Sequence, residues 1–102
     1  MTPEKAKALV IEHINRNYRN PNETLLVVDS ETIEKPYGWV FFYNTKTFIE
    51  TNDFSHALGG NGPVVLLSKD KSLHSLGSAR PLEDEIRAFE EEHGLSPTVP
   101  PS

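Results

Sequence analysis

At the centre of the chain lies the aromatic run Gly38-Trp39-Val40-Phe41-Phe42-Tyr43-Asn44. Successive side chains of a strand point to opposite faces, so Trp39, Phe41 and Tyr43 share one face, and Val40 and Phe42 share the other. A strand that is apolar on both sides must be covered on both sides. The run therefore predicts a central strand of a sheet that has two faces to cover.

The run Val64-Val65-Leu66-Leu67 is apolar on both sides in the same way, and it predicts a second inner strand. A short fourth strand is expected at 73–76, after the turn at 69–72. Upstream, residues 24–34 are β-branched and then alternate with polar residues, which is typical of a strand. We expect this segment to form a hairpin with the aromatic run. Residues 47–50 are expected to extend the aromatic strand or to form a short strand of their own.

Two helices are expected at the two ends of the chain. Thr2 is a good N-cap and Pro3 suits the first helical position. A stripe with helical spacing follows, and it ends before the Asn-rich residues 17–22: Ala6, Leu9, Val10, His13 and Ile14. The second helix is expected to begin at Pro81, with Leu82, Ile86 and Phe89 on its apolar side, and to end at Gly94.

These elements predict an α+β fold with a four-stranded antiparallel sheet and N- and C-terminal helices. Residues 1–94 are expected to form one domain, followed by a proline-rich tail over 95–102. Four strands spaced ~4.8 Å apart are roughly 19 Å wide, which two helices lying side by side would cover. We therefore expect both helices on one face and the other face bare. The alternative is one helix on each face.

The composition favours a small cytoplasmic protein. The chain has 102 residues, no cysteine and a formal net charge of −5, which disfavours nucleic-acid binding. The acidic charge would steer a basic partner toward the protein, and the solubility of a cytosolic protein explains it equally well. The absence of cysteine excludes disulfides and thiolate metal sites. We expect no signal peptide and no membrane span. Residues 51–63 form a long polar and glycine-rich connection, which we expect to carry function.

No catalytic residue, cofactor site or metal site is predicted. The turn Gly59-Gly60-Asn61-Gly62-Pro63 lacks the Lys-Ser/Thr and the following helix of a phosphate-binding loop. The four histidines show no metal-ligand spacing: His13, His56, His74 and His93. His74 and Ser75 are neighbours in a strand and should point to opposite faces, which argues against a nucleophile–base pair. The acidic residues at 83–85 and 90–92 are interpreted as a solvated helix face rather than a docking surface.

Several motifs in this order resemble the YrhB-like family, also called the immunity protein 35 family. They are Gly38-Trp39-Val40-Phe41-Phe42, Glu50-Thr51-x-Asp53, Gly60-Asn61-Gly62-Pro63 and the run from His74 to Glu83. The resemblance spans roughly Ala6 to Glu91. It implies an α+β fold and a bacterial immunity protein that binds and neutralises a polymorphic toxin encoded beside it. The chain departs from the family pattern at 69–72, where the usual glycine is missing, and in its tail.

Two functions follow as hypotheses. The first is a non-enzymatic toxin-binding module, with five expected partner-binding residues: Trp39, Phe41, Tyr43, Asp53 and Asn61. The second is a heat-stable holdase-type chaperone, because one branch of the family is described in this way. A homodimer formed through the bare sheet face is compatible with either. Trp39 itself is favoured as a core residue over an interface anchor.

Overall fold

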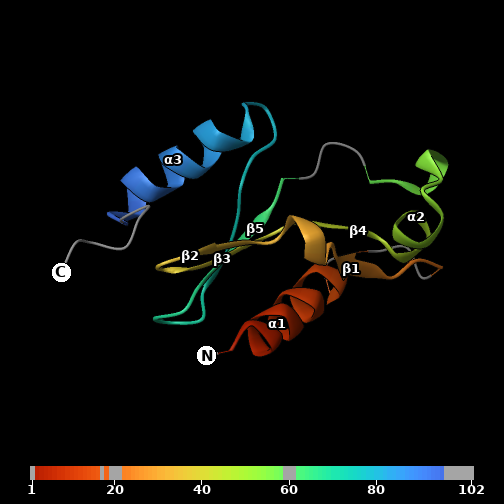
Figure 1. Cartoon of the computed structure of the whole chain (residues 1–102), viewed down its shortest axis with the longest axis horizontal. Helices are drawn as coiled ribbons and strands as arrows, with labels where there is room; N and C mark the ends of the chain where they lie inside the picture. The colour runs from red at the N-terminus through yellow and green to blue at the C-terminus, as the bar shows by residue number, and fades with distance from the viewer. Residues whose placement is uncertain (1, 17, 19–21, 59–61, 96–102) are drawn as a thin grey trace.

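The computed structural model describes residues 2–16, 18, 22–58 and 62–95. They form an α+β fold with a helix near each end of the chain (Figure 1), which confirms the predicted class. The helical elements are α1 (Pro3–Arg16), η1 (Asp29–Glu31), α2 (Lys46–Thr51), η2 (Phe54–His56) and α3 (Leu82–His93), where η marks a 3-10 turn. The strands are β1 (Leu25–Val27), β2 (Ile33–Lys35), β3 (Gly38–Phe41), β4 (Tyr43–Thr45), β5 (Val64–Leu67) and β6 (Leu73–Ser75).

The main sheet has four antiparallel strands in the order β2-β3-β5-β6. A two-stranded sheet, β1-β4, continues the same hairpin past a break at η1. At this break the Val28 N–H still donates to the Phe42 carbonyl at 2.8 Å. The predicted hairpin between 24–34 and the aromatic run is confirmed, with η1 as an interruption. The expectation that residues 47–50 extend the aromatic strand or form a short strand of their own is wrong, because these residues lie in α2.

Gly38 begins β3 at a point where the backbones of β3 and β5 approach closely. Its φ is +155°, and a Cβ placed there would lie 1.9 Å from the Leu66 carbonyl oxygen. Any other residue would force the two strands apart at the end of the hairpin. The turn before it is tied to the end of β5, because the Ser68 N–H donates to the Tyr37 carbonyl at 2.9 Å.

Helix α1 covers one face of the sheet. Its N-cap is Thr2 as predicted, since the Lys5 N–H donates to Thr2 Oγ1 at 3.2 Å. The side chains that this helix buries meet Trp39 and Phe41 of β3 and Val64 and Leu66 of β5: Ala6, Val10 and Ile14. The C-terminal end of α1 is held by Asn15, whose side chain exchanges two hydrogen bonds with the backbone of Leu25, at 2.8 and 2.9 Å.

Helix α3 covers the opposite face (Figure 1). Ile86 and Phe89 pack there with the alternate residues of the inner strands, namely Val40, Val65 and Leu67. The expectation that both helices share one face is therefore wrong. The width argument counted four equal strands, but the apolar surface is concentrated on two of them. A helix about 10 Å across spans two strands spaced ~4.8 Å apart, so each face needs one helix.

Neither face of the inner strands is open. Every residue of β3 and β5 is buried. The bare sheet face, through which a homodimer would have been compatible with either hypothesis, is therefore absent from these two strands. Apolar surface available to a partner must be sought elsewhere on the molecule.

Two carboxylates of α3 are buried rather than solvated. Glu85 accepts a hydrogen bond from Arg80 Nε at 2.9 Å, and this bond holds the pKa of the Glu85 carboxyl below its ordinary value. Glu90 accepts one from the Tyr37 hydroxyl at 2.8 Å and lies 3.4 Å from Lys35 Nζ. Burial, together with the bond to Glu90, raises the pKa of Tyr37. For these two residues the interpretation as a solvated face is wrong.

The segment that precedes α3 also helps to hold this helix in place. A Cβ added to Gly77 would lie 3.2 Å from Glu85 Oε2, so the chain passes close to this carboxylate. Gly94 ends α3 in the left-handed conformation, with φ of 64°, which confirms the predicted C-cap. The run from His74 to Glu83 thus positions α3 on the sheet.

Candidate partner-binding surface

The structure separates the five predicted partner-binding residues. Trp39 and Phe41 are buried under α1, with 9% and 2% of their surface exposed. Tyr43 is half-buried on the same face. Asp53 is exposed between α2 and η2. Asn61 lies outside the described residues.

A different aromatic residue is on the surface. Among the residues that the structure describes, two large apolar side chains are exposed, Phe54 at 81% and Leu82 at 36%. Phe54 begins η2, immediately after Asp53. Together α2 and η2 form what we call the α2–η2 segment, residues 45–58, at one end of the molecule (Figure 1).

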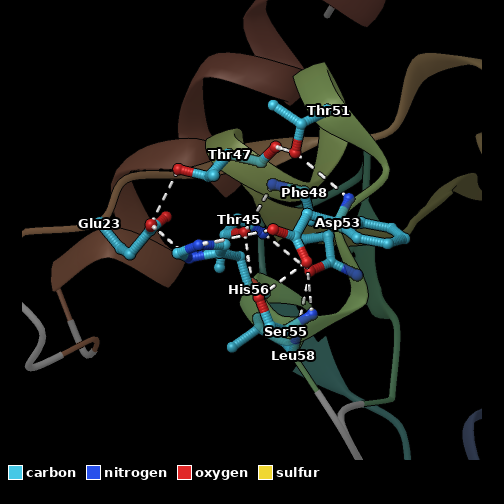
Figure 2. Close-up of polar contacts among 10 residues, drawn as sticks. Glu23, Thr45, Thr47, Phe48, Thr51, Asp53, Ser55, His56 and Leu58 are labelled. Atoms are coloured by element: carbon cyan, nitrogen blue, oxygen red, sulfur yellow. Dashed lines mark hydrogen bonds and ion pairs between the residues drawn. The ribbon is translucent and has the colours of Figure 1, made fainter.

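Thr45 ties the two ends of this segment together. It is the N-cap of α2, where its Oγ1 accepts a hydrogen bond from the Phe48 N–H at 3.0 Å. The same hydroxyl donates to the His56 carbonyl at 2.7 Å (Figure 2). Thr45 is 2% exposed, so both bonds are shielded from water. One buried side chain thereby fixes the start of α2 and the end of η2.

Asp53 holds the turn in which Phe54 lies. Its Oδ1 accepts from the Ser55 N–H at 3.0 Å and from the Ser55 hydroxyl at 2.7 Å (Figure 2). These two bonds stabilise the ionised form and lower the pKa of the Asp53 carboxyl. The Asp53 N–H donates to Thr51 Oγ1 at 3.2 Å. Asp53 therefore carries a negative charge in a defined position beside Phe54.

The segment is also bound to the strands beneath it. Asn44 Oδ1 accepts from the Leu58 N–H at 2.8 Å. Glu23, which precedes β1, accepts from the Thr47 hydroxyl at 2.8 Å and lies 3.6 Å from His56 Nδ1 (Figure 2). The α2–η2 segment is thus an ordered projection and not a loose loop.

The histidines are not gathered into a metal-binding group in the part of the chain that the structure describes. His74 faces α3, where its ring lies 5.3 Å from Phe89 and 5.0 Å from His93. Its Nε2 is 2.8 Å from Ser72 Oγ, but that hydroxyl is only 2.6 Å from Asp70 Oδ1, in the turn at 70–72. The described residues contain no group of three or more His, Asp or Glu side chains placed to hold a metal ion. No helix within the described ranges is long and apolar enough to span a bilayer.

The fold and this surface define a small α+β protein that offers an ordered polar projection with one exposed aromatic side chain. The sequence profile of the family described as Immunity protein 35 matches residues 4–89. The chain therefore belongs to the Immunity protein 35 family, which confirms the resemblance seen in its motifs.

A relative in Escherichia coli (strain K12), named Uncharacterized protein YrhB, is 38% identical over 53 residues. The alignment covers 52% of this chain and 56% of that protein, so the two match over about half of their lengths. No solved structure matches the chain.

Sequence reasoning missed Phe54, although a signal was present. Phe54 is an isolated aromatic residue in the polar stretch 51–56, with Asp and Ser as its neighbours. An aromatic side chain without other apolar residues nearby in the sequence has no amphipathic pattern to bury it. Thr45 and Asp53 were likewise readable as caps, since Thr and Asp favour the position before a helical turn. The signal for an ordered projection was therefore local.

Proposed function

We propose that this protein neutralises a cognate protein toxin by binding to it, in the cytoplasm and without catalysing a reaction. Membership of the Immunity protein 35 family over residues 4–89 is the observation that carries this proposal. Tight binding to a toxin blocks its active site or the path of its substrate, which requires a stable shape rather than a reactive group.

The described chain supports a binding role in two ways. Its core is closed on both faces of the inner strands, so the fold stands without a partner covering it. Its formal net charge of −5 steers it toward a basic partner and speeds encounter. Both features suit a protein that must meet a toxin quickly and in a ready-made conformation.

The test is co-expression with the toxin gene that family membership leads us to expect beside the gene for this protein. Cells should survive only when both proteins are made, and the two should elute as one complex from a size-exclusion column. A catalytically inactive toxin variant allows the dissociation constant to be measured with purified proteins. Killing at full strength in the presence of the protein, with no complex formed, would refute the proposal.

The holdase alternative receives less support. A holdase needs a broad apolar surface for unrelated clients, whereas two large apolar side chains are exposed in the described part of the chain. A light-scattering assay with an aggregating client tests this alternative. Suppression at equimolar ratio by the wild-type protein would favour the holdase function.

A further inference from the structure

We propose that Phe54 is the central contact of the toxin interface and enters an apolar pocket of the toxin that has a basic rim. This inference rests on the proposed function and adds to it the surface used and the chemistry of the surface that it meets. Three features of the α2–η2 segment carry it: the exposure of Phe54, the order of the turn that presents it, and the charges beside it.

The first of these features is the exposure of the Phe54 side chain to solvent. Phe54 exposes 81% of its surface, while Leu82, the other large apolar side chain exposed among the described residues, exposes 36%. Aromatic side chains contribute much of the binding energy at protein interfaces when they fill a pocket. The inner face of Phe54 packs on Phe48, with 5.4 Å between ring centroids. The partner therefore meets an aromatic ring that is already supported from behind.

The turn that presents Phe54 is ordered before binding. Asp53 holds Ser55 on one side of Phe54 through two hydrogen bonds. On the other side of the turn, Thr45 holds the His56 carbonyl at 2.7 Å. Ordering a surface before contact reduces the entropy lost on association. An exposed aromatic side chain on a disordered loop would lose more entropy on association. The ordered turn therefore favours a role for the Phe54 ring in binding.

The charges next to Phe54 indicate the chemistry of the partner. Residues 46–56 carry two exposed carboxylates, Glu50 and Asp53, against one lysine, Lys46. The ring of His56 in the same range lies 3.9 Å from the Asp53 carboxylate. Hydrogen bonds from Ser55 favour the ionised form of Asp53 and fix the position of its carboxylate. Asp53 immediately precedes Phe54 in the sequence, so this charge lies beside the ring. A complementary surface places cationic side chains around an apolar pocket. The partner that binds this surface is therefore the toxin, through an apolar pocket with a basic rim. It is not a second copy of this acidic chain.

The first experiment replaces Phe54 by Ala and measures binding to the inactive toxin by isothermal calorimetry. The matched control is Leu82→Ala, which removes the second large apolar side chain that is exposed in the described ranges, on α3. We expect Phe54→Ala to weaken binding by about 30-fold or more, as at interface hot spots. We expect Leu82→Ala to change it less than about threefold. Thermal melts of both variants should match the wild type, which separates binding from folding.

The outcomes distinguish this inference from the proposed function. If wild type and Phe54→Ala bind with affinities within threefold of each other, the Phe54 interface is refuted while toxin binding stands. If the wild-type protein does not bind, both are refuted. Light scattering at high concentration adds a further check: a wild-type dimer that Phe54→Ala dissociates would show that a second copy occupies the surface, and would overturn the inference.

The second experiment tests the basic rim. Asp53→Asn removes the charge and keeps an oxygen that accepts from Ser55. Asp70→Asn is a matched control, because Asp70 makes the same two bonds to Ser72, at 3.0 and 2.6 Å, in the turn after β5. We expect Asp53→Asn to slow association about two- to fivefold at low salt and to reduce the salt dependence. Equal association rates for the two variants would rule out a basic rim at this position.

Discussion

The two faces of the sheet are both apolar, but the groups that cover them differ in chemistry. Under α1 the fully buried Ala6 and Val10 pack with the aromatic side chains of Trp39 and Phe41. Under α3 the apolar contacts of Ile86 and Phe89 lie beside two buried carboxylates, Glu85 and Glu90. The α1 face therefore depends on packing, whereas the α3 face depends on packing and on ionisation. Stability should respond differently when each face is perturbed.

The largest effect should come from the α1 face. Trp39→Ala removes a large side chain that is 9% exposed, and it should lower the free energy of unfolding by about 3–5 kcal/mol. Urea denaturation followed by far-ultraviolet circular dichroism is the measurement, since Trp39 is the single tryptophan and its fluorescence is lost. A loss below about 1 kcal/mol would show that α1 does not hold this face.

A smaller effect is expected on the α3 face. Ile86→Ala should cost about 2 kcal/mol, the low end for such truncations, because Ile86 lies nearer the edge of its cluster at 7% exposure. Hydrogen exchange should show faster exchange of α3 amides while α1 amides stay protected. The control is Val10→Ala, which should affect α1 instead. Uniform loss of protection in both variants would mean that the two faces unfold as one unit.

The acid dependence of stability should distinguish the faces further. The pKa of Glu85 lies below its ordinary value of 4.5 because of the hydrogen bond from Arg80. A carboxyl with a depressed folded-state pKa contributes stability that is present above 4.5 and is lost as pH falls through the folded pKa. Glu85→Gln should therefore destabilise the protein at pH 7 and have less effect near pH 3. Denaturation curves across this range test it, and an effect that grows toward low pH would contradict the assignment.

The smallest effect on stability is expected away from both faces. Phe54→Ala should change the free energy of unfolding by less than about 0.5 kcal/mol, because the ring is 81% exposed. The same denaturation assay as for Trp39→Ala provides the direct contrast between a core aromatic and a surface aromatic. A cost above about 1.5 kcal/mol would show that the ring supports the fold through Phe48.

Much of the fold was predictable because its signals are local. The alternation in β3 and β5, the cap at Thr2 and the stop at Gly94 each depend on a few neighbouring residues, and all were confirmed. Strand pairing through the hairpin before β3 also followed from the sequence, because a short turn leaves little choice of partner.

The candidate surface was less predictable. Trp39 was favoured as a core residue, and its burial under α1 confirms this, whereas the exposure of Phe54 was not predicted. The expected partner-binding residues on β3 came from counting apolar faces against helices, an argument that fails when each helix covers two strands. Glu85 and Glu90 were likewise interpreted as surface residues. In the structure Arg80 binds Glu85, and Tyr37, which is distant in the sequence, binds Glu90.

The amino-acid sequence by itself determined the α+β class, the two-sided inner strands, the helix ends and the family. Tertiary structure alone decided that the helices take opposite faces and that two carboxylates are buried. The physical reason is range: periodicity and capping act over a few residues, whereas burial depends on which distant segments compete for the same area of sheet.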